Sequence, residues 1–204
     1  MDFSTRCWKR LKLTVCFLIL LLLGVTEIVL ADGIDVKHVE LVEVEGAWQL
    51  NADFDISFNT EIEEALNKGV ALNFLIEFEL AEPHPYWFDD EVASASQRIR
   101  LSYHALSRQY LINAGTHQKS FATLQEAKDE LEKLRSWPVL EKSQIKKNSP
   151  PYYAILRMRL DHARLPKALQ VDALGSEKWE LISERHRWTP VLTNIEQPAP
   201  PVAK

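Results

Sequence analysis

An alternation of apolar and polar residues over positions 48–58 constrains the fold of this chain most strongly. Apolar and polar side chains take turns through the whole segment WQLNADFDISF. A strict period of two predicts a β-strand with one buried face and one solvated face. The pattern returns at Val70–Leu80. Upstream, Ile34–Glu45 is expected to pair with the first strand as a hairpin, with a bulge near Lys37-His38.

Further strands and two helices complete the predicted fold. One helix begins at Thr60 and ends at Gly69; a second begins at Thr123, where Glu126 completes a capping box, and continues to Leu134. The other expected strands are Gln97–Leu106, Gln109–Ala114, Tyr152–Asp161 and Trp179–Trp188. Short connections favour antiparallel pairing. The sequence therefore predicts a mainly β (α+β) protein, an antiparallel β-sandwich-like domain of about seven strands with two short covering helices.

The first 31 residues have the features of an export signal. Basic residues between Arg6 and Lys12 precede an apolar run from Leu13 to Val25, and Val29-Leu30-Ala31 fits a signal peptidase site with a cut before Asp32. The alternative is an uncleaved anchor over residues 13–31. Both interpretations place the rest of the protein outside the cytoplasm, in the periplasm, with membrane contact only through this segment.

Cysteine usage agrees with this interpretation. Cys7 and Cys16 both lie within the signal, so the mature chain uses no disulfide bonds. Lipid attachment at Cys16 is not expected, because a lipoprotein cysteine follows a small residue and Val15 is a poor fit for that position. We expect a single mainly β domain over residues 32–189, which is long enough to fold on its apolar core. A disordered, proline-rich tail is expected over residues 190–204.

Charge is divided sharply along the mature chain. Residues 32–91 contain sixteen acidic and two basic side chains, whereas residues 92–204 contain eleven acidic and eighteen basic ones. Two interpretations are open. Acidic strands pair beside basic strands in one sheet, or the two segments form opposed surface fields that steer a charged partner. A net negative chain with scattered basic residues is not expected to bind nucleic acid.

The densest candidate binding site is the segment His84–Glu91. It combines the aromatic residues Tyr86, Trp87 and Phe88 with the carboxylates of Asp89 and Asp90. Aromatic faces beside polar groups are typical of sites for sugars, peptides or lipid headgroups. The alternative is that Trp87 plugs one end of the sandwich while the carboxylates solvate a turn.

Metal and cofactor sites are not expected. Adjacent carboxylates such as those of residues 89–91 cannot all face one ion, whereas calcium loops space their ligands at alternate positions. The six histidines also lack the spacing of metal ligands.

Two arginine pairs are the second candidate binding feature. Arg98 and Arg100 share one face of a predicted strand, and Arg157 and Arg159 share one face of another. If the two strands lie close together, the four side chains form a basic patch. The alternative is that they pair with the acidic strand that carries Glu77 and Glu79.

Sequence motifs give no support for catalysis. Neither a G-x-S-x-G nor an S-x-x-K nucleophile motif occurs, so no catalytic residue is assigned. The sequence favours a non-enzymatic binding or accessory module. The alternative is an envelope enzyme that acts on a cell-wall or sugar substrate.

An ordered set of short motifs resembles a known family. The set comprises Tyr86-Trp87, Arg100–Leu106, Tyr110, the helix FATLQEAKDELEKL with Trp137, Leu160-Asp161, Leu165-Pro166 and Trp179–Leu181. In order and spacing it resembles an exported proteobacterial family known as domain of unknown function 4390, over residues 36–188. The family has no assigned activity, so the resemblance implies no catalytic residue.

The resemblance also implies a partner. Genes of the family often lie beside genes for a membrane sensor kinase, which implies an envelope protein or a membrane sensor as the partner. The chain departs from the family pattern at His84, where an arginine is expected, and at Leu111, where a basic residue is expected. An anion site built from those two positions is therefore not implied for this chain.

Overall fold

The alternating segments of the sequence form two central strands of the fold. The computed structural model describes residues 33–146, 151–173 and 175–192. The first alternating segment becomes β2 (Ala47–Ser57), in which every second side chain from Trp48 to Ile56 is buried. The second becomes β3 (Leu72–Glu82), whose even-numbered side chains from Leu72 to Leu80 are buried. Both predictions are confirmed.

The predicted hairpin joins β1 (Gly33–Val44) to β2. The two strands pair antiparallel, and their register shifts between Val36 and His38, which confirms the predicted bulge. Glu45 and Gly46 connect the strands with φ angles of 52° and 84°. Two consecutive positive φ angles are typical of the tight turns that match the twist of a hairpin.

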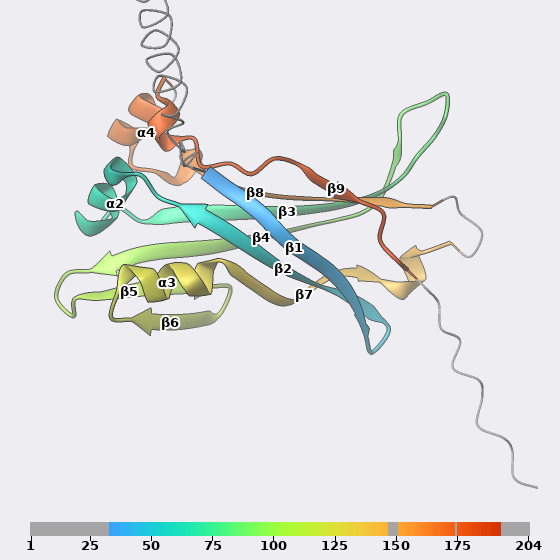
Figure 1. Ribbon diagram of the computed structural model, residues 1–204, viewed down its shortest axis with the longest axis horizontal. Coiled ribbons are helices and arrows are strands. Elements are labelled where there is room, and N and C mark those ends of the chain that lie inside the picture. Colours follow the sequence, from blue (N-terminus) through green and yellow to red (C-terminus); the bar gives the residue numbers. More distant parts are fainter. Residues whose placement is uncertain (1–32, 147–150, 174, 193–204) are drawn as a thin grey trace, which may run out of the picture. The chain divides into compact units, whose positions relative to one another are not determined.

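The strands that the structure describes form two antiparallel sheets (Figure 1). The smaller sheet has the order β1, β2 and β7 (Lys133–Glu141). The larger has the order β6 (His117–Phe121), β5 (Gln109–Ala114), β4 (Asp90–His104), β3, β8 (Tyr153–Leu160) and β9 (His186–Trp188). In Figure 1, β1 and β2 cross over the larger sheet, and contacts of β1 with β8 and of β4 with β7 join the two layers. The predicted mainly antiparallel, sandwich-like fold is confirmed.

One apolar core fills the space between the sheets and beneath two helices. The helices α2 (Thr60–Asn67) and α3 (Leu124–Leu131) each bury an apolar face, as predicted. Large buried members of this core are Phe54, Ile56, Ile62, Leu66, Phe74, Phe78, Leu131, Leu156 and Met158. Because the inward faces of the strands supply the core, the outward faces are left for polar residues and for binding.

Two details of the helices differ from the prediction. The N-cap of α2 is Asn59, whose side chain accepts a hydrogen bond of 3.0 Å from the backbone N–H of Ile62. Thr60, the predicted first residue, is already helical. The capping box of Thr123 with Glu126 is confirmed in α3. However, α3 ends at Leu131, and Leu134 is buried as part of strand β7.

The sequence prediction missed β6 and β7, so the described residues contain nine strands and not about seven. In β7 the alternation is broken by two register shifts, one opposite Trp48 and Gln49 and one between Leu50 and Ala52. Leu50 of β2 faces Trp137, and Ala52 faces Leu134, so two residues of β7 lie opposite the single residue Asn51. Pro138 is tolerated because β7 is at the edge of its sheet, where a missing N–H leaves no partner unpaired.

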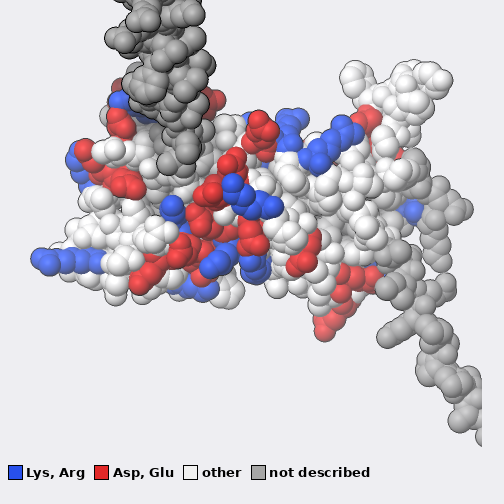
Figure 2. All heavy atoms as spheres, in the orientation of Figure 1, with Lys and Arg blue, Asp and Glu red and all other residues white. Residues whose placement is uncertain are grey.

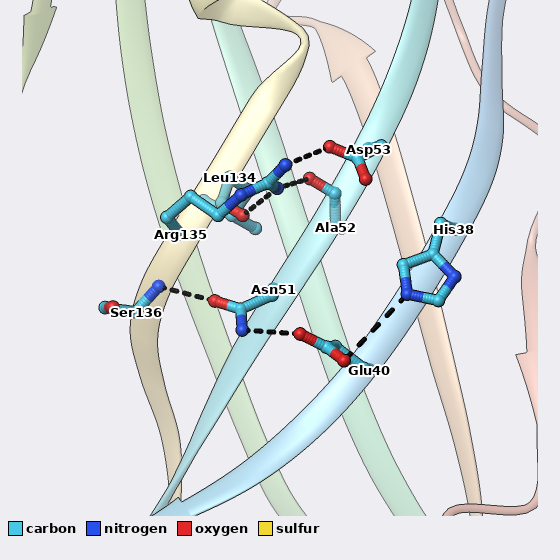
Figure 3. Close-up of polar contacts among 8 residues, drawn as sticks. All are labelled: His38, Glu40, Asn51, Ala52, Asp53, Leu134, Arg135 and Ser136. Atoms are coloured by element: carbon cyan, nitrogen blue, oxygen red, sulfur yellow. Dashed lines mark hydrogen bonds and ion pairs between the residues drawn. The ribbon is translucent and has the colours of Figure 1, made fainter.

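Side chains of β2 hold the bulge in place (Figure 3). The Asn51 carboxamide accepts a hydrogen bond of 2.8 Å from the backbone N–H of Ser136, which has a φ of 52°. It also donates one of 2.9 Å to Glu40 of β1. Arg135 donates to the carbonyl of Ala52 at 2.7 Å and contacts the carboxylate of Asp53. The bulge thus has partners on its strand neighbours.

The last predicted strand is shorter than expected. A 3-10 turn, Glu177–Trp179, ends at the first residue of the predicted strand, and Ile182 forms an isolated bridge with Arg159. Only His186–Trp188 forms regular β9 pairing, against β8. A third short helix, α4 (Lys167–Ala173), precedes this segment.

The acidic and basic segments of the chain pair with each other. Within the described ranges, five ion pairs join them: Glu43 with Lys142, Asp53 with Arg135, Glu61 with Lys178, Glu77 with Arg159, and Glu82 with Lys146. Two of these connect neighbouring strands, β2 with β7 and β3 with β8. Figure 2 shows acidic and basic atoms intermixed over the centre of the face drawn. The interpretation that acidic strands lie beside basic strands is therefore confirmed.

Several predictions concern residues outside the described ranges. The signal or anchor over residues 1–31 and nearly all of the proline-rich tail, from residue 193 onward, lie there. Within the part of the chain that the structure describes, no helix has the length and apolar character needed to cross a membrane.

Candidate functional site

The loop between β3 and β4 presents three aromatic side chains to solvent. Tyr86, Trp87 and Phe88 are 90%, 84% and 95% exposed. Figure 1 shows the loop extending away from the sheet, and Figure 2 shows that its outer part carries no acidic or basic side chain. The alternative in which Trp87 plugs an end of the sandwich is wrong, because a plug would be buried. We call residues 86–88 the aromatic tip.

Polar contacts within the loop close its base. The backbone N–H of His84 donates a hydrogen bond of 3.1 Å to Oδ1 of Asp89. The Nε2 atom of His84 lies 3.1 Å from Oδ2 of Asp90. These two contacts bring the two ends of the loop together around the aromatic tip. Of the four candidate residues that the sequence placed here, two (Tyr86 and Trp87) therefore lie in the tip and two (Asp89 and Asp90) in its support.

A second set of contacts attaches the loop to strands β8 and β9 of the larger sheet. The hydroxyl of Tyr153, in β8, donates a hydrogen bond of 2.6 Å to Oδ2 of Asp89. The guanidinium carbon of Arg187, in β9, lies 3.6 Å from the centre of the Tyr153 ring. This is the geometry of a cation–π contact. We call His84, Asp89, Asp90, Tyr153 and Arg187 the loop clamp.

The clamp shifts the proton equilibria of its members. The hydrogen bond from Tyr153, followed by that from the His84 N–H, lowers the pKa of Asp89 below its ordinary value. The same bond to Asp89 is the main reason that the pKa of Tyr153 is raised. Asp89 is therefore a carboxylate at neutral pH, and its bond with Tyr153 is of the short, charge-assisted kind.

Sequence reasoning did not identify Tyr153 or Arg187. Both lie in strands that are more than sixty residues away from the loop along the chain. The alternation of β8 places Tyr153 on the outward face, which is the one signal available. Tyr153 reaches the base of the loop because β8 pairs with β3. No short sequence motif indicates this pairing.

The two predicted arginine pairs share one face of the larger sheet but do not form one patch. Leu75 of β3 faces Arg98 of β4 on one side and Arg159 of β8 on the other, so β3 separates the pairs. Arg159 donates two hydrogen bonds to Glu77, of 3.1 and 3.4 Å. Arg98 lies 3.8 Å from Asp161. Pairing with the acidic strand, the alternative to a basic patch, is thus confirmed for Arg159.

Arg98 and Arg100 also lie far from the aromatic tip. Arg98 follows Asp90 by eight positions in β4, which corresponds to about 26 Å at the rise of a strand. Arg100 is exposed and lies opposite Asn73. The predicted binding residues therefore fall into two separate groups, one in the loop and one farther along the outward face.

A hollow on that outward face lies between the two groups. It has a volume of about 360 Å³, and its polar lining includes Glu77, Glu79, Glu91, Ser94, Ser96, Arg157 and Arg185. The sequence singled out four of these residues: Arg157, the strand residues Glu77 and Glu79, and Glu91 at the end of the candidate loop segment. Ser94 and Ser96 lie opposite Glu79 and Glu77 in the register of β3 with β4, so only the strand pairing reveals them.

Among the described residues, no group of three metal-ligating side chains is arranged to hold an ion.

Comparisons with known proteins place the chain in a family. A search of curated proteins and a search of solved structures each found no match. A family model described as Domain of unknown function (DUF4390) matches residues 31–189, which is most of the 204-residue chain. The chain therefore belongs to the family with domain of unknown function 4390.

Proposed function

We propose that this protein is an exported, non-enzymatic binding module of the periplasm that docks an envelope protein through its aromatic tip. A membrane sensor is the partner that the family resemblance suggests. The observation that carries the proposal is the exposure of Tyr86, Trp87 and Phe88, each at least 84%, on one clamped loop.

The chemistry of the tip supports protein docking. Tryptophan and tyrosine are enriched among the residues that dominate binding energy at protein interfaces. Three adjacent aromatic rings in water form an apolar patch of the kind that usually marks an interaction site. The absence of charged side chains in the outer part of the loop favours an apolar contact at its centre.

The loop clamp supports the same function. A flexible loop would lose conformational entropy on binding, which reduces affinity. Here Asp89 is tied to β8 through Tyr153, and His84 closes the loop from the other end. The aromatic rings are thereby presented on a base that is fixed before the partner arrives.

The N-terminal sequence supports export. A basic start, an apolar run of thirteen residues and the small or compact residues Val29 and Ala31 have the order of a secretory signal. A partner in the cell envelope is the kind that an exported module meets.

Site-specific crosslinking in cells tests the proposal. A photoreactive amino acid replaces Trp87 in one variant and Leu106 in a control. Leu106 is a suitable control because it is 94% exposed, apolar and located in a different loop, between β4 and β5. We expect a discrete crosslinked envelope protein from position 87 and none from position 106. Equal crosslinking from both positions, or none from position 87, would contradict the docking role.

A further inference from the structure

Arg157 lies on the outward face of the larger sheet without an ion-pair partner among the described residues. It faces Glu77 in the register of β3 with β8, so a cross-strand ion pair would be the simplest arrangement. Glu77 instead directs both carboxylate oxygens to Arg159. The Nε atom of Arg157 is buried and has no hydrogen-bond acceptor among the described residues. Buried donors without a partner are rare because they are costly.

The surroundings of Arg157 are those of a small-molecule site. Arg157 lines the hollow of about 360 Å³ described above and also a neighbouring hollow of about 280 Å³ that contains His162 and Glu180. The first volume lies within the range of ligand pockets. Ser94 and Ser96 add hydroxyl groups on the opposite side of β3. A planar guanidinium is well suited to hold a carboxylate.

Charges of both signs in the hollow define the ligand further. Glu79 and Glu91 line it, and their side-chain carboxylates make no hydrogen bond or ion pair with another described residue. Arg157 and Arg185 are likewise without an ion-pair partner within the described ranges. A phosphate or another multiply charged anion would be repelled by the two carboxylates. A ligand that carries one carboxylate and one ammonium group can pair with both the arginines and the glutamates.

We propose that this hollow binds a small zwitterion, an amino acid or a short peptide, whose carboxylate is held by Arg157 and whose ammonium group faces Glu79 and Glu91. Ile155 supplies an apolar contact on the same wall. The site is independent of the aromatic tip, because none of its lining residues belongs to the tip. The protein thus has a place for a small ligand as well as a place for a partner.

Calorimetric titration of the protein purified from cells tests this proposal, with the dipeptide alanyl-alanine as the probe. Three further probes separate the contributions: the N-acetylated dipeptide, the dipeptide amide and inorganic phosphate. We expect the free dipeptide to bind and each blocked form to bind about tenfold more weakly, because each leaves one charged group in the hollow unpaired. Failure of the dipeptide to bind at millimolar concentration would overturn the proposal. So would tighter binding of phosphate, or equal binding of the amide.

Two variants and a control locate the binding. Arg157→Gln should weaken dipeptide binding by about tenfold or more. Arg100→Gln should leave it unchanged, since Arg100 lies on the same sheet face but does not line the hollow. Ser96→Trp fills the hollow from an exposed strand position that tolerates an aromatic residue, so it should abolish binding even if Arg157→Gln folds poorly. Binding that survives Ser96→Trp, or that falls equally in Arg100→Gln, would place the ligand elsewhere.

Discussion

At the scale of single residues, neighbouring positions in β2 have opposite roles. Phe54 points into the core and is 4% exposed, whereas Asp53 lies on the outward face beside Arg135. Removing a buried ring leaves a cavity that the surroundings fill only in part. Removing one partner of a solvated ion pair costs little, because water and salt already screen the interaction.

Phe54→Ala should therefore lower the free energy of unfolding by about 3–5 kcal/mol. Asp53→Ala should lower it by about 1 kcal/mol or less. Urea denaturation of the two variants beside the wild type measures both values. The opposite order would mean that the two faces of β2 are exchanged.

At the scale of elements, the loop clamp joins the β3–β4 loop to β8 and β9. The lowered pKa of Asp89 adds stability that is present above the ordinary carboxyl pKa and is lost as pH falls through the lowered value. The raised pKa of Tyr153 adds stability that is present below its ordinary value, about 10, and is lost as pH rises through the raised value. The contact between Asp89 and Tyr153 therefore stabilises the loop at neutral pH, and this contribution is lost at both extremes.

Tyr153→Phe tests the clamp directly. The variant keeps the ring beneath Arg187 but removes the hydroxyl that donates to Asp89. The pKa of Asp89, followed by NMR titration of its carboxyl carbon, should rise toward the ordinary value. Tyr152→Phe is the matched control, because the Tyr152 hydroxyl accepts a hydrogen bond from the backbone N–H of Lys146 and makes none with Asp89. An Asp89 pKa that is the same in Tyr153→Phe and the wild type would show that this bond does not form.

Some strands and helices of the fold can be predicted from the sequence, and others cannot. Strands β2 and β3 follow from strict alternation, and the hairpin bulge follows from a slip in that alternation at Lys37-His38. Strand β7 does not follow, because its bulge opposite Asn51 breaks the period of two. A single-residue bulge makes a strand resemble an extension of the preceding helix, which is why α3 was expected to continue to Leu134.

The candidate site also has one part that the sequence predicts and one part that it does not. The aromatic tip is visible in the sequence because its residues are consecutive, from Tyr86 to Phe88. Tyr153 and Arg187 are not visible, since they reach the loop only through the order of strands β3, β8 and β9 in the larger sheet. The role that we propose for Arg157 depends on Glu77 pairing with Arg159 and not with Arg157. Only the side-chain geometry reveals this pairing.

At the scale of the whole molecule, charge balance limits how the protein can recognise a partner. Ion pairs between the acidic and basic segments, such as Asp53 with Arg135 and Glu77 with Arg159, offset part of the charge within each sheet. Long-range steering by one strong field is therefore a weak basis for binding. The docking that we propose then depends on local features, and among the described residues the aromatic tip is the one run of three consecutive, exposed, large apolar side chains.

The affinity of the crosslinked partner for the Trp87→Ala variant tests this account most directly. Trp87 makes no core contact, so the melting temperature of the variant should match that of the wild type. The Kd for the purified partner should rise about thirtyfold or more, which corresponds to about 2 kcal/mol, the loss typical of a tryptophan at the centre of an interface. An unchanged Kd would contradict the docking role of the aromatic tip, and so would a Kd that rises only together with a lowered melting temperature.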